Sequence, residues 1–175
     1  MIAAIGCLFG IWSYPATREN ESTRQALFLG FSFMDGLSIA PLVNSVYLIN
    51  PSILTSTFFY TFLIFASFSF SALRTRRRSY MFLGGILGSL LSILFFGGLA
   101  NMFLGSSMIY TIELYLGLFM FCGYVLYDTQ LIVERVENGT TDFVGDSVLL
   151  FTDFIAVFVR LLIILSKKDE KKKKK

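Results

Sequence analysis

Long apolar runs fill most of this 175-residue chain and limit what it can fold into. Five runs contain 22 to 26 residues each, and a helix of that length crosses the roughly 30 Å hydrocarbon core of a bilayer. A sixth run, Ile2–Tyr14, spans only about 20 Å as a helix. With 55% hydrophobic and 15% charged residues, the chain is predicted to be an all-α polytopic membrane bundle of six helices. The five long runs are Ala26–Ile49, Ser52–Leu73, Ser79–Leu104, Met108–Val133 and Phe143–Ser166.

Basic residues gather beside these runs. Four arginines lie in Arg74–Arg78, and every lysine lies in the tail, at Lys167, Lys168, Lys171, Lys172, Lys173, Lys174 and Lys175. The rest of the chain is slightly acidic, so the net charge of +3 does not indicate nucleic-acid binding. Basic loops indicate the cytosolic side, which is where we place Arg18–Arg24, Arg74–Arg78 and Glu134–Asp142. We predict that residues 167–175 are a disordered tail.

The last apolar run, Phe143–Ser166, conflicts with this topology. If it crossed the membrane, the lysine tail would lie on the side opposite the basic loops. Either the run is re-entrant, or the tail crosses despite its charge. We expect a re-entrant segment, because this run carries Asp146, Asp153 and Arg160 and such a segment is tolerated when other helices surround it.

The chain contains no histidine and two cysteines, Cys7 and Cys122, both within apolar runs. Imidazole metal sites and catalytic triads that use histidine are therefore excluded within this chain. An intramembrane aspartyl protease is disfavoured, because the sequence Phe143-Val144-Gly145-Asp146 has only one of the two glycines of the required motif. We expect neither an enzyme nor a cofactor.

Asp128 and Asp153 are the most informative polar residues, because a carboxylate at bilayer depth costs roughly 2.5–3.5 kcal/mol. Asp128 lies about 8 Å from one end of its apolar run and Asp153 about 9 Å from the corresponding end of the next. The short loop between the runs favours packing of the two helices side by side. Two adjacent carboxylates cannot both ionise freely, so they share a proton and can sense pH without histidine.

This carboxylate pair is predicted to be a pH gate in an ion pathway. When protonated it would hold the two helices together, and when deprotonated it would repel them and attract a cation. Two carboxylates are too few for tight Ca²⁺ binding, so we expect weak, transient Ca²⁺ binding at Asp128 and Asp153. The alternative is a structural role, in which each aspartate hydrogen-bonds a neighbouring helix or pairs with an arginine.

Four further residues are candidate partners of the gate. Asp146 and Arg160 lie seven residues on either side of Asp153 and share its helix face. Asp35 lies within the second apolar run, and Arg18 lies in the first basic loop.

Four segments resemble the Bax inhibitor-1 family of membrane proteins, most closely its animal endoplasmic-reticulum branch. They are Asn50–Leu54, Arg76–Leu87, Tyr127–Ile132 and Asp153–Phe158. The resemblance implies a seven-helix bundle with the last helix at its centre, of which this chain would lack the first helix. The family's paired aspartates fall on Asp128 and Asp153, and an arginine linked to them in bacterial relatives aligns with Arg18. Asp35 stands where the family pattern has an uncharged residue.

The family resemblance implies a pH-sensitive Ca²⁺ leak channel or Ca²⁺/H⁺ exchanger of the endoplasmic-reticulum membrane that suppresses apoptosis and stress signalling. The alternative is a non-conducting adaptor that uses its basic tail to bind apoptotic or stress-sensor proteins, including Bcl-2-type regulators. Lysines at the third and fourth positions from the end also match a retrieval signal of that compartment. Membrane lipid and Ca²⁺ are the other expected partners.

Overall fold

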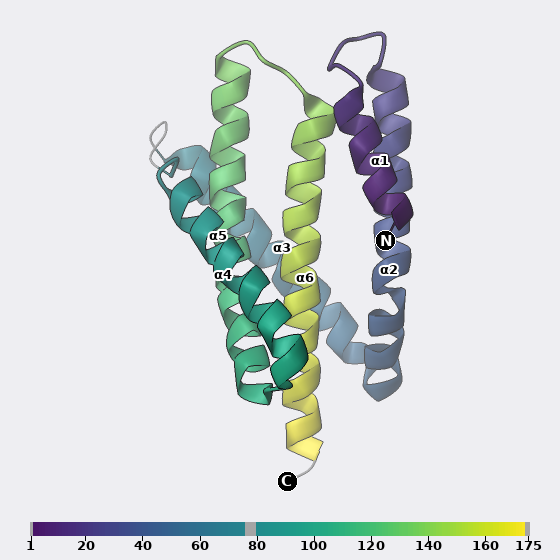
Figure 1. The fold of residues 1–175 in the computed structure, drawn as a ribbon, viewed down its shortest axis with the longest axis vertical. Helices are drawn as coiled ribbons and strands as arrows, with labels where there is room; N and C mark the ends of the chain where they lie inside the picture. The colour runs from purple at the N-terminus through teal and green to yellow at the C-terminus, as the bar shows by residue number, and fades with distance from the viewer. Residues whose placement is uncertain (1, 76–79, 174–175) are drawn as a thin grey trace.

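The computed structural model describes residues 2–75 and 80–173. These residues form six helices joined by short loops (Figure 1), and five of the helices are long and apolar enough to cross a membrane. The predicted helical membrane bundle is confirmed. The helices are α1 Ile2–Ser13, α2 Glu21–Ile49, α3 Pro51–Arg74, α4 Leu83–Leu104, α5 Ser107–Glu137 and α6 Phe143–Lys173.

Local sequence explains where the helices begin and end. Asn50 begins α3 by accepting a hydrogen bond from the Ser52 amide at 3.1 Å, while Pro51 occupies the first turn, where no amide proton is needed. Gly105 ends α4 in the left-handed region, at a φ of 61°, and glycine adopts that conformation without steric cost.

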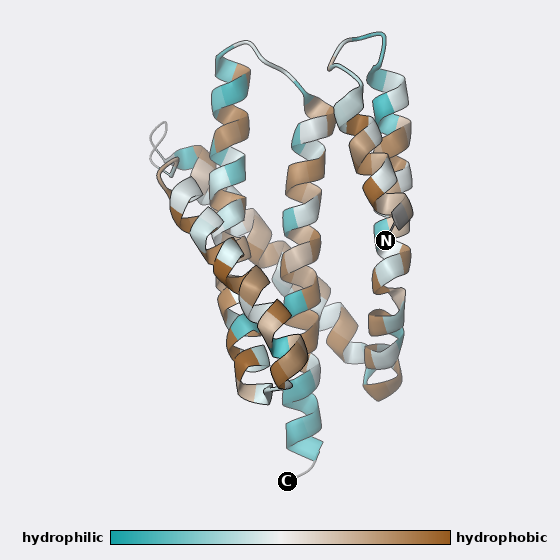
Figure 2. Cartoon of the chain, viewed as in Figure 1, coloured by the Kyte–Doolittle hydropathy of each residue, from teal (hydrophilic) through white to brown (hydrophobic). Residues whose placement is uncertain are grey.

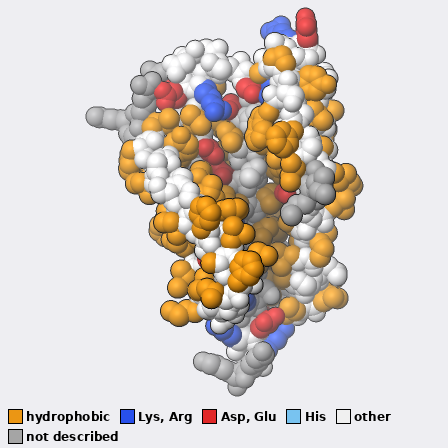
Figure 3. Space-filling model, viewed as in Figure 1, with side chains coloured by type: hydrophobic (Ala, Val, Ile, Leu, Met, Phe, Trp, Pro, Cys, Tyr) orange, Lys and Arg blue, Asp and Glu red, His pale blue; other side chains and the backbone are white. Residues whose placement is uncertain are grey.

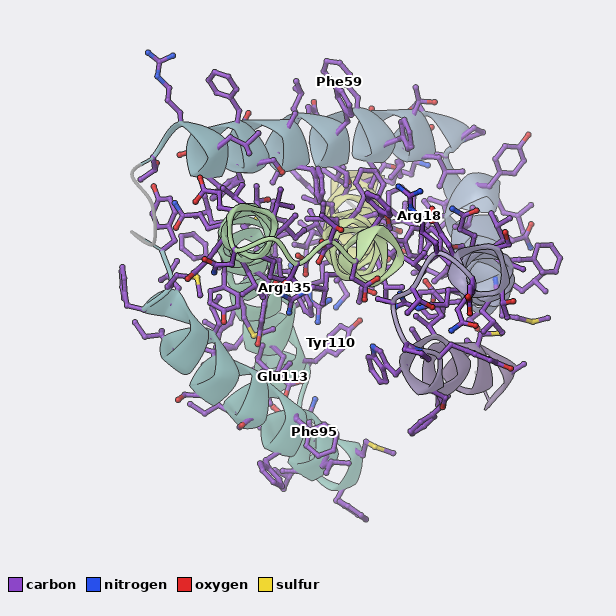
Figure 4. The ribbon with its side chains drawn as sticks, turned by 90° about the horizontal axis from the view of Figure 1, so that it is seen from above. Arg18, Phe59, Phe95, Tyr110, Glu113 and Arg135 are labelled. Atoms are coloured by element: carbon purple, nitrogen blue, oxygen red, sulfur yellow. The ribbon has the colours of Figure 1, made fainter. Side chains whose placement is uncertain are left out.

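The last helix, α6, lies at the centre of the bundle. Seen from above in Figure 4, it stands between α5 and the α1–α2 pair, with α3 passing along one side. Its Val144 and Val148 pack in one buried cluster with α1 and α2, and its Leu162 packs in another with α2 and α3. Helix α4 packs only against α5 among the described helices.

Our expectation of a re-entrant last segment is wrong. Helix α6 is one continuous helix of 31 residues that begins at the end of the bundle carrying the α1–α2 loop and finishes at the opposite end (Figure 1). At 1.5 Å per residue it is about 46 Å long, more than the hydrocarbon core requires. Its polar residues do not force it to turn back, because they face a neighbouring helix rather than lipid.

The expectation that residues 167–175 are disordered is also corrected: α6 continues through the tail and ends at Lys173. Lys174 and Lys175 lie outside the described residues. Lysine is a good helix former, so a helix that leaves the bundle can continue through it. Within this extension Lys173 forms an ion pair with Asp169 at 3.2 Å and donates a hydrogen bond to the Ile49 carbonyl at 3.1 Å. The basic tail therefore begins as an ordered helix.

The outer surface suits a membrane. Large hydrophobic side chains are exposed around the bundle, among them Phe103 at 90% and Phe119 at 83%. Figures 2 and 3 show hydrophobic residues along the flanks and hydrophilic or charged residues concentrated toward the two ends. Water would not favour so much exposed apolar surface, whereas lipid accommodates it.

Candidate functional site

The candidate site is the interface between α5 and α6, where side chains of the two helices contact each other at three levels along the helix axes. From the loop end downward, Asp146 contacts Arg135, Asp153 contacts Asp128, and Arg160 contacts Phe121. From one level to the next, the residue number rises by seven on α6 and falls by seven on α5. This is expected for antiparallel helices, because a helix presents the same face again after about two turns. We call this interface the α5–α6 seam. The predicted shared face of Asp146, Asp153 and Arg160 is therefore present.

The carboxyl groups of Asp128 and Asp153 are hydrogen-bonded to each other at the middle level. They are nearly inaccessible to solvent, with exposed fractions of 6% and 4%. Ionised carboxylates only accept hydrogen bonds, so this contact requires a proton on one of the two groups. Oδ2 of Asp153 is buried and receives no hydrogen bond from an amide, hydroxyl, ammonium or guanidinium group in the described part of the chain. The two groups therefore meet as a protonated carboxylic acid and a hydrogen-bond acceptor inside the bundle.

Apolar side chains close the seam around this pair. Val125 on α5 and Val157 on α6 each lie about one turn from an aspartate and are completely buried. A residue three or four positions away on a helix shares its face, so these two valines lie on the same faces as the aspartates. The carboxylate pair therefore lies in the buried part of both helices.

Two ion pairs lie at the loop end of the bundle. Arg135 donates to Asp146 at 3.0 Å, one level above the carboxylate pair. Arg24, whose exposed fraction is 4%, binds both oxygens of Asp142 at 2.7 and 2.8 Å and also donates to the Ile11 carbonyl at 3.2 Å. Because Arg24 binds it, the pKa of the Asp142 carboxyl is lowered from its usual value.

Asp142 also positions the start of α6. Its side chain accepts a hydrogen bond from the Gly145 amide at 2.9 Å, the geometry of a helix N-cap. Through Asp142, the buried Arg24 links the start of α2 to the start of α6, the central helix. A cavity of about 560 Å³ lies beside this link and is lined by Ala16, Thr17, Arg18, Glu21, Arg24, Thr141, Asp142, Phe143 and Val144.

The remaining predicted residues lie away from the carboxylate pair. Arg18 is exposed in the α1–α2 loop, beside the cavity at Arg24 (Figure 4), and Asp35 is half-buried on α2. Lys167 lies against the Tyr110 ring at 4.0 Å, and Lys168 and Lys171 line a second cavity of about 600 Å³ at the tail end. The structure brings Asp128, Asp153, Asp146 and Arg160 into one seam and leaves Arg18, Asp35 and the lysines outside it.

Sequence reasoning missed three residues. Arg24 and Asp142 are 118 residues apart, and no local pattern connects them. Gln130 is 95% buried; its side chain accepts from the Tyr80 amide at 2.8 Å and donates to the Ala72 carbonyl at 3.4 Å. Gln130 therefore ties α5 to the end of α3 and to the start of the segment leading into α4. Its position within an apolar run was the available signal, since an amide in such surroundings needs partners.

A resident metal site is not evident. Among the described residues, no three His, Cys, Asp or Glu side chains are grouped so that they could hold a metal ion. The two carboxylates at the middle level of the seam, Asp128 and Asp153, offer four oxygens, fewer than the six to eight that Ca²⁺ takes. Ca²⁺ binding there would need water or backbone carbonyls to complete the coordination.

The fold and the seam define a class: a multi-pass helical membrane protein with a buried pair of carboxyl groups, one on its central helix and one on the helix beside it. The family model described as "Inhibitor of apoptosis-promoting Bax1" matches residues 1–170. The chain is 47% identical over 174 residues to "Probable Bax inhibitor 1" of Paralichthys olivaceus, covering 99% of this chain and 73% of that protein. It is 45% identical over 180 residues to "Bax inhibitor 1" of Homo sapiens, covering 100% of this chain and 76% of that protein. It is 41% identical over 174 residues to "Bax inhibitor 1" of Arabidopsis thaliana, covering 98% of this chain and 70% of that protein. The chain belongs to the Bax inhibitor-1 family.

Proposed function

We propose that this protein suppresses apoptosis and stress signalling from the endoplasmic-reticulum membrane as a pH-sensitive Ca²⁺ leak channel or Ca²⁺/H⁺ exchanger. The observation that carries the transport proposal is the hydrogen-bonded pair Asp128–Asp153, buried between two membrane-crossing helices. Buried ionisable groups at such depth are costly and usually belong to ion or proton pathways. The family names support the part played in apoptosis.

The seam explains how protons would control ion passage. With one shared proton, the hydrogen bond holds α5 and α6 together and leaves no free pair of carboxylates for a cation. Loss of that proton places two negative charges side by side, so the helices repel each other and the site attracts Ca²⁺. Ca²⁺ and H⁺ thus compete for the same oxygens, which suits either a gated leak or an exchange of the two ions. No enzymatic step and no bound cofactor enter this proposal.

The test is Ca²⁺ flux from liposomes that contain the purified chain, at pH 6 and pH 8. We expect greater flux at pH 8, and we expect Asp128→Asn and Asp153→Asn to remove most of the difference. Glu170→Gln is the matched control, because Glu170 is an exposed carboxylate on the tail extension of α6. A pH response that persists unchanged in both well-folded aspartate variants would refute the gate.

The adaptor is the second candidate, and the tail extension is the observation that favours it. Lys168, Lys171 and Lys172 are exposed on the extension of α6 at one end of the bundle. A basic helix of this kind presents charges to an acidic segment of an apoptotic or stress-sensor protein, or to anionic lipid. Replacing these three lysines by glutamine in cells should abolish protection from apoptosis if the adaptor is the active form. Full protection by that variant, together with flux in liposomes, would leave the transporter as the explanation.

A further inference from the structure

Arg160 occupies the third level of the α5–α6 seam. Its Cζ lies 4.3 Å from the centre of the Phe121 ring, and its Nη1 donates to the Ala156 carbonyl at 3.2 Å. Its Nε lies only 2.5 Å from the point that a Cβ on Gly117 would occupy. The guanidinium is thus seated directly on the backbone of α5, in a space that exists because residue 117 has no side chain.

The positive charge of Arg160 is not balanced by a nearby carboxylate. Within residues 2–75 and 80–173, Arg24 and Arg135 are ion-paired with aspartates, whereas no carboxylate lies within ion-pair distance of Arg160. Arginine keeps its charge under all physiological conditions, and an aromatic face compensates only part of it. A half-buried guanidinium therefore faces the seam with an unpaired charge.

Arg160 lies on the tail side of the carboxylate pair. Seven residues separate it from Asp153 on the same face of α6, which places it about 10 Å further along the helix. A cation that leaves the carboxylate pair toward the tail end must pass this charge if it follows the seam.

We propose that Arg160 is the selectivity residue of the tail-side half of the ion pathway, a fixed positive charge that limits cation passage and limits divalent cations most. This inference rests on the transport function proposed above. The repulsion is proportional to the charge of the permeating ion, so Ca²⁺ feels twice the energy that K⁺ feels. Gly117 is part of the same arrangement, because any side chain at that position would displace the guanidinium.

The expected size of the effect of Arg160 on ion occupancy follows from the distance between its charge and the permeating cation. For a divalent cation about 10 Å from a unit charge, at an effective dielectric constant of about 20, repulsion lowers occupancy on the order of 100-fold. For a monovalent cation the factor is the square root, on the order of tenfold. Water in an open pathway reduces both factors, but the factor for the divalent cation remains the square of the factor for the monovalent cation.

The experiment measures Ca²⁺ and K⁺ flux from liposomes containing the full chain as wild type, Arg160→Gln, Arg160→Lys or Gly117→Ala. We expect Arg160→Gln to raise Ca²⁺ flux at least about tenfold and K⁺ flux by about the square root of that factor. Arg160→Lys keeps the charge and should retain the wild-type ratio of the two fluxes. Gly117→Ala should shift the ratio in the direction of Arg160→Gln, whereas Gly88→Ala, where a Cβ meets nothing within 4 Å, should not. Arg74→Gln, at an exposed arginine, is the charge control.

The outcomes separate this inference from the proposed function. If wild type conducts Ca²⁺ and Asp153→Asn changes that flux, but Arg160→Gln leaves the Ca²⁺ to K⁺ ratio unchanged, the role of Arg160 is refuted and the carboxylate gate stands. Equal increases in both fluxes would also refute it, because a loosened bundle does not distinguish ions by charge. If wild type shows no ion flux and Arg160→Gln conducts, the proposed role of the Arg160 charge in limiting cation passage is supported. If every folded variant is silent, the transport function and this inference both fail.

Discussion

The link between Arg24 and Asp142 allows a sharp test, because its two partners are buried to different degrees. The Arg24 side chain is 5% exposed and the Asp142 side chain is 28% exposed. If Asp142→Asn removes the negative charge, the guanidinium is left buried and uncompensated. If Arg24→Gln removes the positive charge, the carboxylate can still be hydrated and can still accept from the Gly145 amide. We therefore expect the aspartate variant to cost more stability than the arginine variant.

The magnitude follows from the geometry. Removing one partner of a fully buried ion pair costs about 3–5 kcal/mol. The partial exposure of Asp142, and the one hydrogen bond that asparagine can retain, reduce this to about 2–3 kcal/mol for Asp142→Asn. For Arg24→Gln we expect about 1–2 kcal/mol, since hydration compensates the carboxylate. The double variant should cost no more than Asp142→Asn alone, because the second change removes the buried charge that the first left unpaired.

The assay is thermal unfolding of the four proteins in detergent, repeated from pH 7 to pH 3. The pKa of Asp142 is lowered in the folded protein, so its ion pair stabilises the fold above the unfolded pKa of about 3.9 and loses this effect as pH falls through the lower folded value. The difference in thermal stability between wild type and Asp142→Asn should therefore become smaller only below about pH 4. Asp169→Asn, in the more exposed pair with Lys173, should change stability by at most about 1 kcal/mol. Additive losses, or a larger loss for Arg24→Gln, would refute the reasoning.

Three further outcomes are expected. Gln130→Leu should lower thermal stability by about 1–3 kcal/mol, because it removes the side chain that bonds the half-buried Tyr80 amide and the Ala72 carbonyl; an unchanged melting temperature would contradict this. Gly84→Val should destabilise the protein and Gly88→Val should not, because a Cβ at Gly84 would lie 2.9 Å from the Tyr127 ring, whereas the position at Gly88 is open; a thermal shift assay compares them. Asn20-Glu21-Ser22 and Asn138-Gly139-Thr140 match the Asn-X-Ser/Thr sequence of N-glycosylation sites. Asn20 and Asn138 lie in loops at the same end of the bundle, so in microsomes both should be glycosylated or neither; modification of one alone would contradict the fold.

The arrangement along the helix axes could be predicted from the sequence, because it depends on local periodicity. Apolar run length gives the membrane-crossing helices, and the seven-residue spacing of Asp146, Asp153 and Arg160 places them on one face. Packing of α5 beside α6 then follows from the short loop between them. Residue spacing and loop length were accordingly enough to locate the carboxylate pair.

The arrangement between distant helices could not be predicted in this way. Arg18 and Arg24 lie in the same basic stretch, and nothing local indicates that Arg24 is buried against Asp142 while Arg18 is exposed. The re-entrant expectation failed for a related reason. Charge counting treats Asp146, Asp153 and Arg160 as a cost to a crossing helix, whereas their partners on α5 provide compensation that only the packed bundle reveals.

The seven-residue step of the α5–α6 seam limits which changes in chain length the protein can tolerate. One residue inserted between Asp146 and Asp153 would rotate the rest of α6 by about 100°, so Asp153 and Arg160 would leave the seam while Asp146 stayed in it. An insertion of one or two full turns would approximately restore the face, but it would move Asp153 about 5 or 10 Å further from Asp146 along the helix. We therefore expect insertions and deletions among homologues to concentrate in the loop between α5 and α6 and in the tail extension. The stretch from Asp146 to Arg160 should keep a constant length even where its apolar residues are exchanged.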